Sequence, residues 1–111
     1  MKFTNGANIN MTSLKGEFPI TFSELCEIFG PPDMGPNHRD MDKVTCEWKL
    51  KFADGTVASI YDYKTGRTPM GEYEWHIGGH SADAYTHVVD AIVLHRDKLV
   101  KMIREYSREG A

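Results

Sequence analysis

The clearest prediction of the fold comes from residues 44–63, VTCEWKLKFADGTVASIYDY. Apolar and polar side chains alternate over 44–52 without a break, a period of two that is typical of a strand with one buried face. The dipeptide Asp54-Gly55 then predicts a tight turn into a second strand over 56–63. The stretch therefore predicts an antiparallel hairpin.

Two registers are open for this hairpin, and they place its tyrosines differently. A two-residue turn puts Tyr61 and Tyr63 on the core face. A three-residue loop, with Gly55 in the left-handed region, pairs Leu50 with Ala58 and turns both tyrosines to the opposite face. We favour the three-residue loop because the shorter turn sets a serine against Leu50 in the core.

Two helices and a third strand flank the hairpin. Thr21 and Glu24 form a capping box, and an apolar stripe then predicts a short helix over 22–29, which a glycine and two prolines end. Residues 73–77 alternate as a third strand, and apolar residues at three- and four-residue steps predict a long helix over 82–107. Its apolar stripe is wide, which predicts a homo-oligomer formed through this helix.

The composition is that of one ordinary globular domain. The chain has 111 residues, of which 41% are hydrophobic and 26% charged. We expect a single α+β domain over residues 1–111: a three-stranded antiparallel meander, with the short N-terminal helix and the long C-terminal helix packed on one face.

The same composition excludes several function classes. There is no apolar run long enough to span a membrane, and the N-terminus is too polar for a secretory signal. The formal net charge of -3 argues against general nucleic-acid binding. The two cysteines, Cys26 and Cys46, fall at apolar positions outside any metal-binding or disulfide pattern. These features predict a cytoplasmic protein.

The strongest local pattern for a ligand lies where the third strand gives way to the last helix. Gly78 and Gly79 end the strand, and free N–H groups at the start of a helix favour an anion. Basic side chains on the preceding loop would complete a phosphate or carboxylate site. The alternative is that the glycines only permit a tight turn and Ser81 caps the helix.

Aromatic side chains on neighbouring strands give a second pattern. Tyr61, Tyr63, Tyr73 and Trp75 would form a stacking platform for a base or a partner side chain if they share an exposed sheet face. The alternative is that they belong to the core. In the favoured register Asp62 faces the core side, where it needs a hydrogen-bonding partner or the open edge of the sheet.

The two patterns together define the candidate ligand-binding residues. They are Tyr61, Tyr63, Lys64, Arg67, Trp75, His76, Gly78, Gly79, His80 and Ser81. Ser81 and His80 are adjacent, but the serine is better explained as a helix cap, and no histidine spacing is typical of a metal site. We therefore expect no catalytic residue, no metal site and no cofactor.

Several segments together resemble a family of small uncharacterised bacteriophage proteins. The similarity runs from about Thr12 into the last helix. The segments are TSLKG (12–16), FGPP (29–32), DKV (42–44), EW (47–48), DGTVA (54–58), IYDYK (60–64) and WHIGGH (75–80). The family has no assigned activity, so no functional residue is carried over. The resemblance implies a short protein made in the cytoplasm of an infected host cell.

Three functions follow as expectations. The first is a non-enzymatic phage accessory protein that binds a phosphate-bearing small molecule and sequesters a nucleotide signal of host defence. The alternative is an inhibitor of a host or defence protein that works by direct contact, through its aromatic side chains and its last helix. A third is a structural accessory domain whose activity is oligomerisation.

Overall fold

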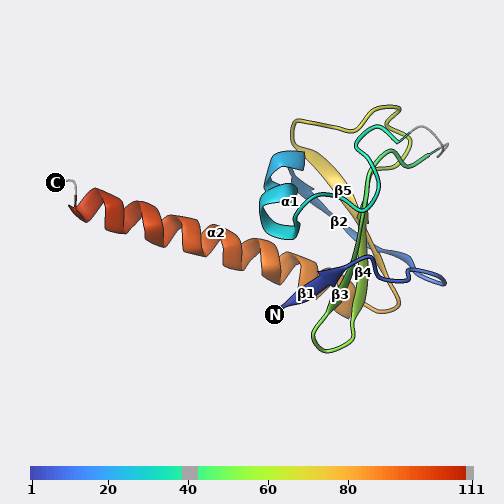
Figure 1. Cartoon of the computed structure of the whole chain (residues 1–111), viewed down its shortest axis with the longest axis horizontal. Helices are drawn as coiled ribbons and strands as arrows, with labels where there is room; N and C mark the ends of the chain where they lie inside the picture. The colour runs from blue at the N-terminus through green and yellow to red at the C-terminus, as the bar shows by residue number, and fades with distance from the viewer. Residues whose placement is uncertain (39–42, 110–111) are drawn as a thin grey trace.

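A five-stranded antiparallel sheet with two helices on one face is the architecture of the computed structural model, which describes residues 1–38 and 43–109 (Figure 1). The strands lie in the order β1-β3-β4-β5-β2. The elements are β1 (Phe3–Asn5), β2 (Ser13–Ile20), α1 (Phe22–Phe29), β3 (Glu47–Phe52), β4 (Val57–Tyr61), β5 (Tyr73–Gly79) and α2 (Asp83–Glu109).

The prediction of a three-stranded meander is wrong. The meander exists as β3, β4 and β5. In addition, β1 pairs with β3 and β2 pairs with β5, so one further strand lies on each side of the meander. β1 is too short to show a period, and β2 contains Gly16 and Pro19, which both weaken a strand pattern. Pro19 is tolerated because β2 is an edge strand, where one side of the backbone needs no sheet partner.

The favoured hairpin register is confirmed. Leu50 lies opposite Ala58, and the backbone N–H of Phe52 donates to the carbonyl of Thr56 at 2.8 Å. Gly55 closes the loop with a φ of 91°, a value that side chains rarely adopt. The register turns Tyr61 away from the helices and places it directly opposite His76 of β5.

The core lies between the sheet and the two helices. Trp48 and Trp75 are fully buried at its centre, with their ring centroids 5.5 Å apart in an edge-to-face arrangement. The Trp48 indole N–H donates to the carbonyl of Gly30 at 2.9 Å, which satisfies its polar atom at the end of α1. The predicted short helix over 22–29 is confirmed, with the Thr21 hydroxyl accepting from the Glu24 N–H.

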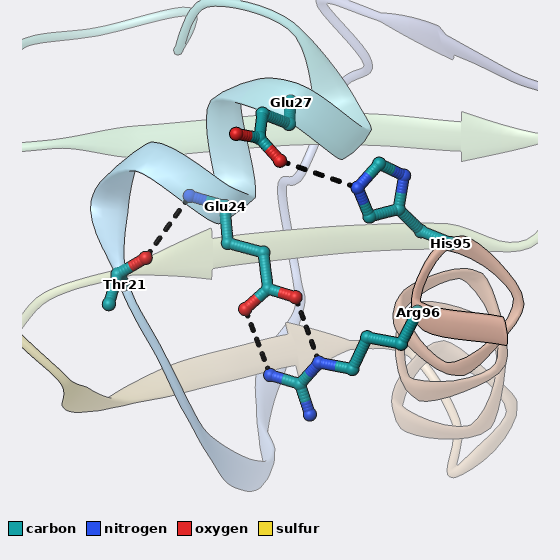
Figure 2. Close-up of polar contacts among 5 residues, drawn as sticks. All are labelled: Thr21, Glu24, Glu27, His95 and Arg96. Atoms are coloured by element: carbon teal, nitrogen blue, oxygen red, sulfur yellow. Dashed lines mark hydrogen bonds and ion pairs between the residues drawn. The ribbon is translucent and has the colours of Figure 1, made fainter. Parts of the chain in front are cut away.

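Polar side chains join α1 to α2 on the solvent side of this core (Figure 2). The Arg96 guanidinium donates to both carboxylate oxygens of Glu24, at 2.8 and 2.9 Å, and this bond lowers the pKa of Glu24. One turn further along α1, Glu27 lies 3.4 Å from His95. These polar contacts hold α2 against α1 at the point where it leaves the domain.

Only the first half of α2 packs on the sheet. Every residue over 96–108 is exposed, and Figure 1 shows this part of the helix projecting from the domain. The radius of gyration is 15.0 Å, against about 13 Å for a compact chain of this length. The predicted long helix is therefore present, but its second half does not lie on the face of the sheet.

The β3–β4 loop is tied to α2 by a carboxylate–imidazole contact with a predicted pH dependence. His87 Nε2 lies 2.6 Å from Asp54 Oδ2, and hydrogen bonds from His87 and Thr56 lower the pKa of Asp54 from 3.8 to about 2. A lowered carboxyl pKa stabilises the fold above pH 3.8, and this contribution is lost as the pH falls towards 2. Urea unfolding should show wild type more stable than Asp54→Asn at pH 5, with the difference shrinking below pH 3.8. A difference that stays constant over this range would contradict the assignment.

Candidate functional site

Gly78 and Gly79 are not the open strand-to-helix turn that the anion site requires. Both lie within β5, paired with β2 on one side and β4 on the other. The connection to α2 is instead residues 80–82, and the helix begins at Asp83. Its first turn thus already carries a negative charge, which opposes a second anion there.

The alternative reading of this segment, a tight connection with a cap, fits the geometry. A Cβ added to Gly79 would lie 2.2 Å from the Ala84 Cβ, so the glycine permits α2 to approach the sheet closely. The Ser81 hydroxyl accepts from the Asp83 N–H at 3.3 Å, and the Ser81 carbonyl accepts from the Ala84 N–H. His80 is exposed beside this cap.

The basic residues of the candidate site lie at the opposite end of the sheet. Lys64 and Arg67 belong to the loop that leads into β5, whereas His80 and Ser81 follow its last residue. β5 is 7 residues long, and a strand rises about 3.3 Å per residue, so roughly 20 Å separate its two ends. The structure therefore does not bring the two halves of the predicted phosphate site together.

Trp75 does not belong to an exposed aromatic platform. Its side chain is fully buried against Trp48 and, edge-to-face at 5.4 Å, against Tyr73. The cause is the pleat of β5, because Trp75 and Ile77 point to the helix side and His76 points to the other. For this residue the core interpretation is correct.

A cluster of three tyrosines and a histidine lies at the end of the sheet where β4 ends and β5 begins. The Tyr61 and His76 rings are stacked at 5.4 Å, and the Tyr63 and Tyr73 centroids lie 5.9 and 6.1 Å from His76. The Tyr73 hydroxyl accepts from the Tyr63 N–H at 3.2 Å and lies 3.5 Å from His76 Nδ1. We call these four residues, with Glu17, the tyrosine–histidine surface.

Acidic side chains flank this surface. Glu17 of β2 lies 3.4 Å from His76 Nε2 and is partly exposed. Burial raises the pKa of Tyr61, and the neighbouring charges of Glu47 and Glu17 raise it further. The negative field around Tyr61 disfavours a phosphate group. A basic group also lies against the cluster: the Lys64 ammonium is 5.4 Å from the centre of the Tyr63 ring.

A buried carboxyl holds the turn that carries Tyr63. Asp62 is fully buried, and its Oδ1 accepts from the backbone N–H groups of Thr45 and Cys46 at 2.8 and 3.0 Å. Its Oδ2 accepts from the hydroxyl groups of Thr45 and Thr65. The expectation that Asp62 faces inward and needs partners is confirmed. These bonds fix the chain on both sides of Tyr63, so the ring is presented from a rigid base.

Cys46, beside Asp62, is a structural residue. Both cysteines are free, and burial raises the pKa of the Cys46 thiol to about 12. Cys26 is partly buried and packs against the core. Neither thiol therefore contributes a reactive group to the tyrosine–histidine surface.

The sequence pattern predicts Tyr61, Tyr63, Lys64 and His76 near one another, but it does not predict Glu17 beside them. Glu17 reaches the surface only because β2 pairs with β5, where it lies directly opposite His76. A signal was present, since Leu14, Gly16, Phe18 and Ile20 alternate with polar residues and proline. Recognising β2 as an edge strand would have identified this acid.

Comparison with known proteins assigns no function. No family model, curated protein or solved structure matches the chain. Among residues 1–38 and 43–109, no helix is both long and apolar enough to cross a bilayer. The resemblance to small bacteriophage proteins stays a prediction, and function has to be inferred from the surfaces described above.

Proposed function

We propose that this chain is a non-enzymatic binding protein that acts by direct contact with another protein through the tyrosine–histidine surface. The observation that carries the proposal is the packing of Tyr61, Tyr63 and Tyr73 around His76. Tyr63 is 41% exposed, while its backbone N–H is bonded to Tyr73. Partly buried, rigidly held tyrosines are typical anchors of protein interfaces, because little side-chain entropy is lost on binding.

The charges beside these rings indicate the chemistry of the partner. Glu17 is exposed enough to meet a cation, and the chain as a whole carries a net charge of -3. An arginine or lysine of the partner would gain both a carboxylate and an aromatic face at this surface. We therefore expect a basic segment of a protein as the partner, and not a phosphate-bearing small molecule.

The resemblance to small bacteriophage proteins supports a more specific role. In that context the chain would act in the cytoplasm of an infected bacterium as an inhibitor of a host or defence protein. Covering a basic functional segment of the target with the tyrosine–histidine surface would be the inhibitory step. No group on this chain needs to react for such an inhibitor to work.

Substitution of Tyr63 tests the proposed function. Immobilised wild-type chain is exposed to bacterial lysate, a protein that it captures is purified, and its dissociation constant is measured by calorimetry. We expect Tyr63→Ala to weaken binding about tenfold or more, the usual effect of removing an aromatic anchor. Met11→Ala is the matched control, because Met11 is 93% exposed and precedes β2 at the end that pairs with Gly79, away from Tyr73.

Two results would contradict the proposed function. One is a captured protein that binds Tyr63→Ala as tightly as wild type. The other is a nucleotide that binds the wild-type chain and is lost on Arg67→Ala, which would favour the phosphate-binding function. Circular dichroism of each variant should match the wild type, since Tyr63 and Arg67 lie outside the core.

A further inference from the structure

The part of α2 that projects from the domain, residues 97–109, is amphipathic although nothing in the described part of the chain covers it. We call it the α2 arm. Leu99, Met102, Ile103 and Tyr106 recur at helical spacing on one stripe and are 39%, 63%, 64% and 79% exposed. The opposite side of the arm is charged, with Asp97, Lys101, Arg104 and Arg108.

This stripe continues the buried face of the same helix. Ala84, Val88 and Ile92 point into the core, and steps of seven residues lead from Ile92 to Leu99 and on to Tyr106. The apolar face therefore extends well past the edge of the sheet. The packed first half of α2 already supplies the helix nucleus, but most helical stability in proteins comes from packing of the apolar face, and in the single chain the apolar face of the arm is exposed.

We propose that the α2 arm pairs in antiparallel orientation with the α2 arm of a second copy of this chain. Lys98 and Glu105 lie seven residues apart and therefore flank the stripe on the same side. If Leu99 packs opposite Met102 of the second copy, Lys98 comes to lie beside Glu105 of that copy. Two-fold symmetry repeats the ion pair, so the arm is complementary to itself in charge as well as in apolar character.

The register also sets the extent of the paired segment. It sets His95 opposite Tyr106 of the second copy, so that the paired segment spans residues 95–106. His95 and the neighbouring Arg96 are where α2 is held against α1, through Glu27 and Glu24 (Figure 2). A parallel pairing would instead place Lys98 beside the apolar Ile103 of the second copy and form no ion pair. The arm and the tyrosine–histidine surface are separate, so the two proposals are independent.

Charge reversal tests both the pairing and its orientation. Lys98→Glu sets two pairs of like charges against each other in the dimer, and so does Glu105→Lys. Each variant should raise the dimer dissociation constant about tenfold.

Mixing the two variants should restore the dimer as a heterodimer. The glutamate introduced at position 98 of one chain then meets the lysine introduced at position 105 of the other, and the second pair keeps the wild-type Lys98 and Glu105. If one of the two variants is isotope-labelled, native mass spectrometry separates the heterodimer from both homodimers by mass.

Two further variants serve as a negative and a positive control for loss of the dimer. Lys101→Glu makes the same charge change on the polar side of the arm and should leave the dimer unaffected. Ile103→Glu puts a charge into the stripe and should leave only monomer at concentrations where wild type is dimeric. Ile103 is 64% exposed in the single chain, so the domain should remain folded, as near-ultraviolet circular dichroism of the buried Trp48 and Trp75 would report.

The outcomes separate the possible occupants of the arm. Wild-type dimer, weakened single variants and a recovered heterodimer support the antiparallel pair. Wild type that is monomeric at every concentration overturns the proposal and assigns the stripe to a different protein or to a membrane surface. This register is overturned if neither charge reversal changes the dimer dissociation constant, or if the mixture of the two variants contains no heterodimer.

Discussion

Asp62→Ala is expected to lose about 3 kcal/mol or more of the free energy of unfolding. The substitution leaves the backbone N–H groups of Thr45 and Cys46 buried without an acceptor, and it also removes the partner of the Thr65 hydroxyl. Each orphaned buried donor costs about 1–3 kcal/mol, because it has given up water without a replacement. The loss should therefore be far larger than that of a single exposed hydrogen bond.

Urea unfolding followed by tryptophan fluorescence measures this loss, since Trp48 and Trp75 are both buried. Asp90→Ala is the control, because Asp90 lies on the exposed side of α2 and should leave stability nearly unchanged. A loss below about 1 kcal/mol for Asp62→Ala would show that the network does not hold the turn. The variant should also weaken partner binding, because Asp62 fixes the segment that presents Tyr63.

Gly79→Ala is expected to lose about 2 kcal/mol, the cost of overpacking a core. The added Cβ would lie 2.2 Å from the Ala84 Cβ and 3.1 Å from the Val57 carbonyl oxygen. Both are held by α2 or by the sheet, so neither can move aside as the tip of a long side chain would. The start of α2 must shift outward or β5 must bend.

Gly71→Ala is the matched control for this experiment. A Cβ at Gly71 would meet nothing within 4 Å, so the same chemical change should have little effect on stability. A stable Gly79→Ala variant would contradict the packing role of this glycine.

The middle of the chain could be predicted from local pattern because its elements are specified locally. The alternation over 44–52 and the Asp54-Gly55 turn specify β3 and β4 and leave two registers, of which the one that keeps a serine from facing Leu50 is observed. A capping box specifies α1. Burial on one face fixes such a register, since a slip of one residue would expose every core side chain. The long helix is equally clear from its apolar period.

The edge strands and the assembly of the site depend on pairing between distant segments. β1 and β2 are made by contacts with β3 and β5, and their own propensity is weak. The two halves of the candidate phosphate site lie apart for a topological reason. Consecutive antiparallel connections alternate between the two ends of a sheet, so Arg67 and Ser81 must lie at opposite ends.

Native mass spectrometry is the most direct test of whether the partner is a protein. The wild-type chain is incubated with the nucleotide fraction of a bacterial lysate and, separately, with its protein fraction. We predict an unchanged mass with the nucleotides, and with the proteins a discrete complex that Tyr63→Ala fails to form. A nucleotide adduct on the wild-type chain, with no protein complex dependent on Tyr63, would contradict the proposed function.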